Sequence, residues 1–146
     1  MNEEEICIFE LDENSTFSMI YEIFKDVTYK ATEEKVNNIL MEYNENRNKI
    51  LFGYFLDKKI IGIIGVEENT KNNIIEILHF GIYEKYRNKN YGTKLMDYIR
   101  NKYSEKTLYL TTDDDAIGFY KKYGYKITEY YKEYNGVKYK RYKCEL

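Results

Sequence analysis

A short basic loop reads Tyr86-Arg87-Asn88-Lys89-Asn90-Tyr91-Gly92-Thr93, between the apolar run Ile74–Tyr83 and an amphipathic helix that we predict over about 92–103. The N–H groups of a helix's first turn lack partners within the helix, and the helix dipole favours negative charge at that end. Arg87 and Lys89 add two positive charges to the loop. A strand, a basic loop and a helix in this order predict a site that holds a pyrophosphate group.

Hydrophobic periodicity predicts the elements on either side of this loop. In chain order they are a strand at 6–9, helices at 16–25 and from 33, strands at 51–56, 60–66 and 74–83, a helix at 92–103, a strand at 107–111, a helix ending at Gly124, and strands at 125–134 and 137–144. The order β-α-α-β-β-β-α-β-α-β-β predicts one α/β domain over 1–146, with a mixed sheet and helices on both faces.

Three local signals support these boundaries. Thr32 precedes an acidic turn and is expected to cap the second helix. The run Asp113-Asp114-Asp115 is expected to open the last helix. Asn135-Gly136 is the strongest two-residue signal for a β-hairpin, and this turn places Glu133 opposite Lys138, a favourable cross-strand pair.

Composition argues against several classes of function. The chain has 146 residues, 43% of them hydrophobic, and a formal net charge of −2, whereas broad binding to nucleic acid needs a strongly basic face. No apolar run reaches the roughly 18 residues of a membrane span, and the acidic start Met1–Glu5 does not fit a secretory signal. Cys7 and Cys144 are too few for a disulfide scaffold and are expected to pack in strands. We therefore predict a cytoplasmic protein without a nucleic-acid or membrane partner.

Two motifs resemble those of the GNAT superfamily of N-acetyltransferases. The strand Glu76–Ile82 and the loop Arg87–Thr93 resemble its acetyl-CoA motif, Gln/Arg-x-x-Gly-x-Gly/Ala. The segment Asp113–Tyr125 resembles its second motif, roughly Asn-x-x-Ala-x-x-x-Tyr-x-x-x-Gly-Phe. The predicted order of strands and helices is also the order in that family, so the resemblance covers the whole chain. It implies a GNAT fold with acetyl-CoA as the acetyl donor and no metal.

Two positions depart from the family pattern. Asn90 stands where the first glycine of the acetyl-CoA motif is usual, and that glycine permits a left-handed backbone. Asparagine is the other residue that adopts this conformation readily, so we expect the loop to keep its shape. Asp113 replaces the usual asparagine of the second motif.

The resemblance implies a set of residues that bind the donor. Phe80 and Ile82 are expected to offer backbone groups to pantetheine, and Gly81 is expected to lie at a bulge that opens a cleft beside the strand. The implied donor-binding residues are Phe80, Ile82, Arg87, Asn88, Lys89, Asn90, Tyr91, Gly92, Thr93 and Asp113.

The resemblance also implies two catalytic residues. Tyr120 matches the family tyrosine that protonates the leaving thiolate as a general acid. Glu76 matches the glutamate that some members use as a general base through water, and burial on a central strand raises the pKa of such a group. His79 is an alternative base, because its ordinary pKa lies near neutrality. Three residues apart on a regular strand, Glu76 and His79 are expected to face opposite sides of the sheet.

These expectations predict direct transfer of an acetyl group from acetyl-CoA to a primary amine of a small molecule or peptide. In the family the acceptor is held by the first two helices and the last hairpin, which here carry acids and aromatic residues such as Asp26 and Tyr130. Asn90 and Asp113 leave open an alternative, a CoA-binding sensor or interaction module without transferase activity. A protein that binds another nucleotide through the same loop is a further alternative, and a homodimer through sheet edges also remains open.

Overall fold

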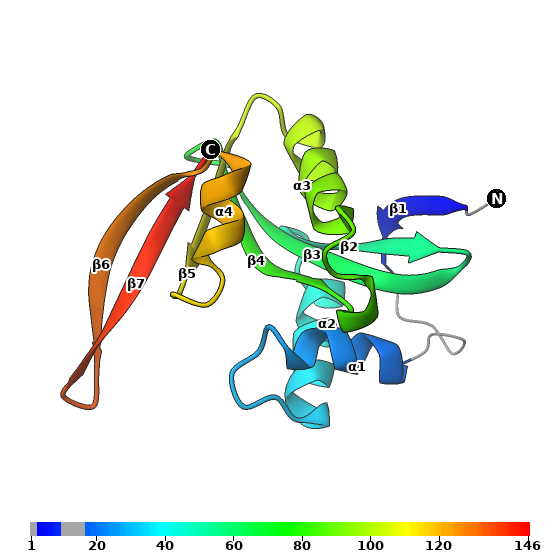
Figure 1. The fold of residues 1–146 in the computed structure, drawn as a ribbon, viewed down its shortest axis with the longest axis horizontal. Coiled ribbons are helices and arrows are strands. Elements are labelled where there is room, and N and C mark those ends of the chain that lie inside the picture. Colours follow the sequence, from blue (N-terminus) through cyan, green and yellow to red (C-terminus); the bar gives the residue numbers. More distant parts are fainter. Residues whose placement is uncertain (1–2, 10–16) are drawn as a thin grey trace.

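A mixed sheet of seven strands lies at the centre of the structure, a computed structural model that describes residues 3–9 and 17–146 (Figure 1). The strands lie in the order β1-β2-β3-β4-β5-β7-β6. The elements are β1 (Glu4–Ile8), α1 (Phe17–Lys25), α2 (Glu33–Glu45), β2 (Lys49–Leu56), β3 (Lys59–Asn69), β4 (Ile74–Ile82), η1 (Glu84–Tyr86), α3 (Tyr91–Lys102), β5 (Thr107–Thr112), α4 (Ile117–Tyr123), β6 (Lys126–Tyr134) and β7 (Val137–Glu145). Apart from the short 3₁₀ turn η1, this is the predicted order.

The neighbouring strands β4 and β5 run parallel and pair over a short distance. Ile74–Glu76 of β4 pairs with Thr107–Tyr109 of β5, although β4 continues to Ile82 and β5 to Thr112. Beyond that point β4 stays paired with β3, and β5 stays paired with β7. The two strands therefore separate after Glu76, and the sheet opens between them.

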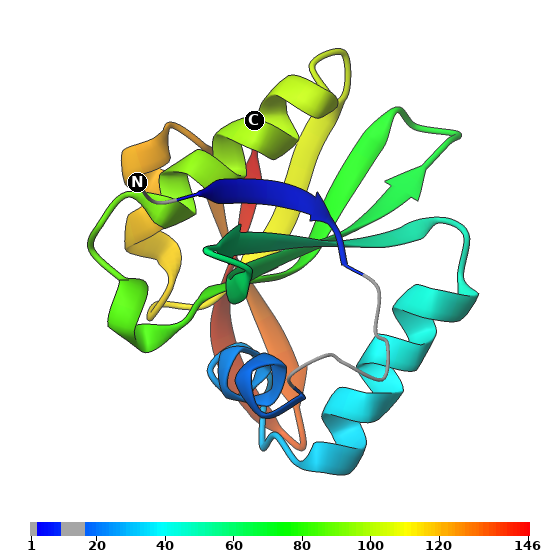
Figure 2. The ribbon, with the colours of Figure 1, turned by 90° about the vertical axis from the view of Figure 1, so that its right-hand side faces the viewer.

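Helices cover both faces of the sheet, as predicted (Figure 2). α1 and α2 lie on one face, and α3 and α4 lie on the other. Each face has its own apolar core, and each fully buried Leu, Ile or Phe contributes about 1.5–3 kcal/mol. The core under α1 and α2 contains Ile20, Ile23, Phe24, Val36, Leu40, Leu51, Ile60 and Ile63. The core under α3 and α4 includes Leu95, Met96, Ile99, Tyr120, Ile64, Ile75, Leu108, Leu110 and Cys144.

Two of the three local sequence signals lie where they were predicted. Thr32 caps α2, and its hydroxyl accepts a hydrogen bond of 3.1 Å from the backbone N–H of Lys35. Asn135 and Gly136 form the turn between β6 and β7 with φ angles of 51° and 78°, and Glu133 pairs with Lys138 as expected. Local hairpin chemistry thus sets the register of the last two strands.

The start of α4 differs from the prediction. The helix begins at Ile117 rather than in the acidic run Asp113-Asp114-Asp115. Asp113 Oδ1 accepts a hydrogen bond of 3.1 Å from the backbone N–H of Asp115. This side-chain bond gives the backbone an alternative to helical pairing and keeps the segment in a turn.

β4 contains a bulge, but not at the predicted residue. Gly65 of β3 pairs with His79 and the next residue, Val66, pairs with Ile77, so Leu78 has no partner on β3. Gly81, where the bulge was expected, keeps a regular pairing with Ile63. The extra residue lies beside the point where β4 leaves β5, and a bulge both bends a strand and increases its twist.

The bulge also overturns the prediction that Glu76 and His79 face opposite sides. One unpaired residue shifts the alternation of side chains by one, so residues three apart come to share a face. Glu76 lies in register with Glu67 and, one strand further, with Lys49, and Lys49 forms an ion pair with Glu42 of α2. His79 forms a hydrogen bond with Tyr43, also on α2. Both side chains therefore lie on the face that α1 and α2 cover.

We predict that Gly65→Ala destabilises the fold, because Tyr43 crosses the strand at this glycine. A Cβ on Gly65 would lie 1.8 Å from the Tyr43 hydroxyl, so the ring must move and give up its bond to His79. We expect a loss of about 1–3 kcal/mol in the free energy of unfolding, measured with urea. The matched control is Gly118→Ala in α4, where a Cβ meets no atom within 4 Å and where alanine favours the helix by up to about 1 kcal/mol. Equal stability of the two variants would contradict this prediction.

Candidate functional site

A cleft with a volume of about 1610 Å³ opens where β4 and β5 separate. Its lining comes from β4, the loop before α3, α3 itself, the end of β5, α4, Arg141 of β7 and the connection between α1 and α2. Every predicted site residue except Lys89 lines this cleft. The facing edges of β4 and β5 do not pair with each other here, so their N–H and C=O groups can meet an extended ligand.

The loop before α3 presents a series of backbone N–H groups at the start of the helix. Asn88 and Asn90 both adopt the left-handed conformation, with φ angles of 61° and 68°, so Asn90 has the backbone conformation that was expected of it. The first backbone bond of α3 runs from Lys94 N to the Asn90 carbonyl at 3.0 Å. Among the described residues, the N–H groups of 88–93 donate to no protein acceptor, so they remain available to phosphate oxygens at the positive end of the helix dipole.

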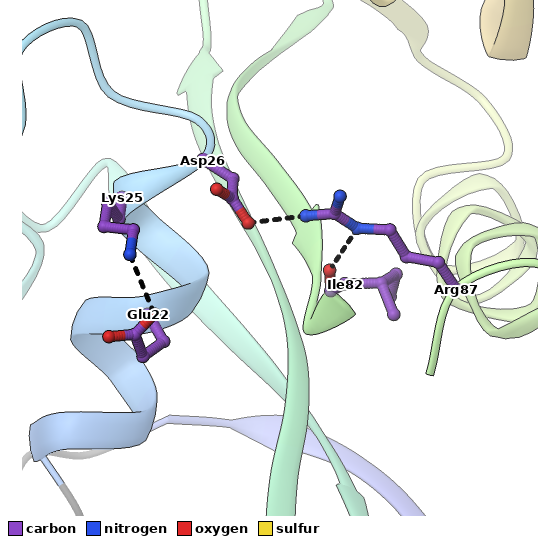
Figure 3. A network of polar contacts seen from close by, with 5 residues as sticks. All are labelled: Glu22, Lys25, Asp26, Ile82 and Arg87. Carbon is purple, nitrogen blue, oxygen red and sulfur yellow. Dashed lines mark hydrogen bonds and ion pairs between the residues drawn. The ribbon is translucent and has the colours of Figure 1, made fainter. Parts of the chain in front are cut away.

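The two cations predicted for this loop have different surroundings. Lys89 is exposed and forms no ion pair within the part of the chain that the structure describes. Arg87 is held from two sides: its Nη2 lies 2.6 Å from Asp26 Oδ2, and its Nε donates to the Ile82 carbonyl at 3.0 Å (Figure 3). The Arg87 guanidinium therefore connects the end of β4 to the residue that follows α1.

Tyr120 lies against the cleft from α4. Its side chain is 7% exposed and is enclosed by Phe80, Phe119 and Tyr125, with ring centroids 6.3, 5.4 and 5.5 Å away. Within the described residues its hydroxyl has no hydrogen-bond partner, although Tyr120 lines the cleft. Burial, together with the nearby Cys144 and Asp113, raises the pKa of Tyr120. The phenol thus keeps its proton at neutral pH and is fixed in position by packing.

Glu76 lies at the last paired position of β4 before the strands separate. Glu76 is partly buried and pairs with Glu67 on the neighbouring strand β3. Lys49 on β2 pairs in turn with Glu67, so the three side chains lie next to one another on three adjacent strands. Burial raises the pKa of Glu76, the negative charge of Glu67 raises it further, and Lys49 opposes both effects. A carboxylate in these surroundings is a better proton acceptor at neutral pH than an exposed one.

His79 lies in a different environment although it shares the face of Glu76. Its Nδ1 and the Tyr43 hydroxyl are 2.6 Å apart in a hydrogen bond, and the Phe24 ring packs against the imidazole edge to face at 5.3 Å. Burial, aided by Lys49, lowers the pKa of His79 to about 4. The imidazole is therefore neutral at physiological pH, with one ring nitrogen engaged by Tyr43.

Four residues of the site were missed or left without a role by sequence reasoning. Tyr43 fixes His79, and Glu67 raises the pKa of Glu76. Arg141 of β7 lines the cleft near Thr111, with 3.5 Å between Nη2 and Oγ1. Asp26 was expected on the acceptor side only as one acid among many, and its ion pair with Arg87 had no sequence signal.

None of the described helices has the length and apolar character needed to cross a membrane. In residues 3–9 and 17–146 no three His, Cys, Asp or Glu side chains gather in a way that would hold a metal ion.

Comparisons with known proteins agree with this geometry. A family model described as an acetyltransferase (GNAT) domain matches residues 12–146. No curated protein matches the sequence.

Solved structures with the same fold are numerous. The ribosomal-protein-S18-alanine N-acetyltransferase of Escherichia coli is 14% identical, with a TM-score of 0.71 and coverage of 99% of this chain and 93% of the other. The PaiA N-acetyltransferase of Thermoplasma acidophilum, solved with coenzyme A, is 19% identical, with a TM-score of 0.67 and coverage of 96% and 98%. An aminoglycoside 6′-N-acetyltransferase solved with coenzyme A is 17% identical, with a TM-score of 0.72 and coverage of 97% and 96%. At these identities the likeness concerns the fold.

We predict that His79 makes the stability of the protein depend on pH. Its pKa in the folded state, about 4, lies below the ordinary value of 6.5, so the unfolded chain binds the proton first as the pH falls. Stability should therefore decrease from pH 7 to pH 4, with a contribution from His79 of up to about 3 kcal/mol. Urea unfolding across this range should give a steeper pH dependence for the wild type than for His79→Gln. Parallel curves would show that His79 titrates normally.

Proposed function

The chain belongs to the GNAT family of acetyl-CoA-dependent N-acetyltransferases, and we propose that it acetylates a primary amine of a small molecule or peptide by direct attack of the amine on the thioester. One observation carries this proposal: the cleft between β4 and β5 has an anion cradle at the start of α3 and a protonated, rigidly packed tyrosine on α4. The donor and the acceptor would approach this cleft from opposite faces of the sheet.

The donor fits the side of the cleft near α3 and α4. The N–H groups of 88–93, with Lys89 beside them, would hold the pyrophosphate. The unpaired edge of β4 at Phe80 and Ile82 would hold the amide groups of pantetheine, as a strand holds an added strand. Gly92 packs the start of α3 closely against this edge, since a Cβ there would lie 3.4 Å from Phe80 and 3.5 Å from Phe119. Asp113 lines the same cleft at the end of β5.

Tyr120 is proposed as the general acid. When the C–N bond forms and the C–S bond breaks, the sulfur leaves as a thiolate and needs a proton or a hydrogen bond. With ordinary pKa values near 10 and 8.5, full proton transfer from a phenol to a thiolate costs about 2 kcal/mol. Burial raises the pKa of the phenol and that of the thiol, because both anions lose contact with water. The difference between the two pKa values therefore does not increase greatly. A hydrogen bond from Tyr120 that strengthens as the thiolate forms is sufficient.

Glu76 is proposed as the general base, acting directly or through one water molecule. An amine attacks only when it is neutral, and most free amines are protonated at pH 7. A carboxylate whose pKa is raised toward neutrality accepts that proton more readily than an ordinary one. Glu76 also lies on the face of the sheet that the α1–α2 connection borders, away from the core under α3 and α4.

The acceptor class is proposed from charge and from the structural neighbours. The Glu76 carboxylate lines the cleft and favours a cationic amine over an anionic ligand, whereas the charge of Asp26 is already paired with Arg87. Two neighbours are by their names an aminoglycoside 6′-N-acetyltransferase and a ribosomal-protein-S18-alanine N-acetyltransferase. A suitable panel is therefore kanamycin, spermidine, lysine and a short peptide with a free N-terminal alanine.

The proposal is tested by incubating the purified chain with acetyl-CoA and each amine of this panel, and by following free thiol and acetylated product. Amine-dependent thiol release with an acetylated product supports it. Calorimetric binding of acetyl-CoA, in the absence of transfer to any amine, would favour the CoA-binding sensor instead. Binding of ATP in preference to acetyl-CoA would point to another nucleotide.

We predict that Tyr120→Phe lowers kcat by about 10²-fold, because the thiolate loses its hydrogen-bond donor. The dissociation constant for acetyl-CoA should stay within twofold, since the phenol ring remains packed. Tyr123→Phe is the matched control. Tyr123 lies one turn further along α4, also lines the cleft, and its hydroxyl donates a hydrogen bond of 2.6 Å to Asp97. In steady-state kinetics, kcat of Tyr123→Phe should stay near the wild-type value. Similar kcat values for the two variants would remove Tyr120 from the reaction.

We predict that Glu76 sets the acid limb of the pH–rate profile. In the wild type, kcat/KM should fall as Glu76 becomes protonated, and Glu76→Gln should lose about 10- to 100-fold in activity together with that limb. Glu67→Gln removes the neighbouring negative charge that raises the pKa of Glu76, so its acid limb should move to lower pH with activity retained. An unchanged acid limb in both variants would assign the base to another group.

A further inference from the structure

Arg87 makes two directed contacts that together join the end of β4 to the segment after α1 (Figure 3). Its Nε donates to the carbonyl of Ile82, the last residue of β4, at 3.0 Å. Its Nη2 lies 2.6 Å from a carboxylate oxygen of Asp26, the residue that follows α1. Arg87 and Asp26 are 61 residues apart in the chain, so this contact joins segments that no local structure brings together.

We propose that Arg87 is a positioning residue: it holds the wall formed by Asp26–Tyr29 against the end of β4 and so shapes the acceptor side of the cleft, while the phosphates are bound by the backbone cradle and Lys89. This proposal rests on the proposed function, because it assigns a role to the acceptor wall of that same site. It differs from the sequence-based expectation that Arg87 itself binds the donor.

The position of Asp26 supports this role. A carboxylate directly after the C-terminus of α1 faces the negative end of the helix dipole, which is unfavourable unless a cation lies beside it. The nearest residue along the chain that could neutralise it, Lys25, points to Glu22 instead, with 3.1 Å between Nζ and Oε2 (Figure 3). Arg87 therefore supplies the counter-charge for Asp26 from the loop that follows β4.

The segment after Asp26 belongs to the site. Asp26, Val27, Thr28 and Tyr29 all line the cleft, and Val27 also packs over the end of β4, where a Cβ on Gly81 would lie 3.0 Å from its side chain. A shift of this segment would change the shape of the acceptor wall without touching the cradle at the start of α3. Placement errors of about 1 Å at a reacting amine are costly in rate.

The chemistry of the guanidinium explains why the residue is arginine. Its planar fork presents Nε and Nη2 in fixed directions, so that one side chain bonds a carbonyl and a carboxylate at once. A lysine in the same place keeps a positive charge near the phosphates but cannot reproduce both contacts. Arg87→Lys thus distinguishes donor binding from positioning. A residue that binds phosphate through its charge tolerates this substitution better than a residue that holds two segments together through two directed contacts.

The pair contributes little to global stability. The Arg87 and Asp26 side chains are 45% and 41% exposed, and ion pairs in such surroundings contribute about 0–1 kcal/mol. Loss of the contact should therefore leave the unfolding midpoint nearly unchanged and act on the local placement of 26–29. This separates a positioning role from a purely structural one.

The experiment compares Asp26→Asn, Arg87→Lys and the double variant with Glu22→Gln, which breaks the adjacent Lys25–Glu22 pair on the same surface and is the matched control. We expect each single variant to raise KM for the most rapidly acetylated amine of the panel about 3- to 10-fold, with the dissociation constant for acetyl-CoA within twofold of wild type. The double variant should have an acceptor KM no higher than that of either single variant, because both substitutions remove the same contact between Arg87 and Asp26. Glu22→Gln should behave as wild type.

Three results would overturn the proposal: a raised dissociation constant for acetyl-CoA in Arg87→Lys, a normal acceptor KM in Asp26→Asn, or additive effects in the double variant. Amide hydrogen exchange of residues 26–29 provides a readout that needs no activity. Faster exchange in Asp26→Asn and Arg87→Lys, but not in Glu22→Gln, supports the proposal that Arg87 holds residues 26–29 in place. Unchanged exchange contradicts it. If the wild type acetylates no amine, the proposed function fails, and the exchange experiment still decides whether Arg87 holds this wall.

Discussion

The separation of β4 from β5 after Glu76 is the constraint on which the site depends. A parallel pair that continued to Ile82 would use the N–H and C=O groups of both strands for each other and would leave no cleft. Each strand is instead held on its outer side, β4 by β3 and β5 by β7, so the two halves of the sheet diverge without unravelling. The packed cluster of Phe80, Phe119 and Tyr120 then lines the opening that results.

The bulge at Leu78 decides which side chains share each face of that opening. Past the bulge, Phe80 and Ile82 turn toward α3 and α4, while His79 joins Glu76 on the side of α1 and α2. Without the bulge, Glu76 and His79 would lie on opposite faces of the sheet. One unpaired residue therefore separates a face with Phe80 and Ile82, toward α3 and α4, from a face with Glu76 and His79, toward α1 and α2.

The sequence predicts those features whose causes are local. The Thr32 cap, the Asn135-Gly136 turn and the left-handed conformation of Asn90 depend on a few neighbouring residues, and all three were predicted correctly. The bulge depends on how Gly65 and Val66 meet another strand, and on the Tyr43 ring that lies over Gly65, and the family resemblance placed it wrongly at Gly81. The contact between Asp26 and Arg87 and the pair Glu67–Glu76 join distant segments, which one sequence without its partners cannot indicate.

The environments of Glu76 and His79 distinguish two bases that the sequence left as alternatives. They now share a face, so geometry does not separate them, but their pKa values move in different directions relative to neutral pH. Burial and the charge of Glu67 bring the pKa of Glu76 upward from the acidic range, whereas burial takes that of His79 down to about 4. His79 also uses Nδ1 for Tyr43, whose own pKa burial raises, so that hydroxyl stays protonated and keeps the bond. An imidazole held neutral and fixed in this way supports packing between α2 and β4, and the carboxylate is the stronger candidate for accepting the proton of the amine.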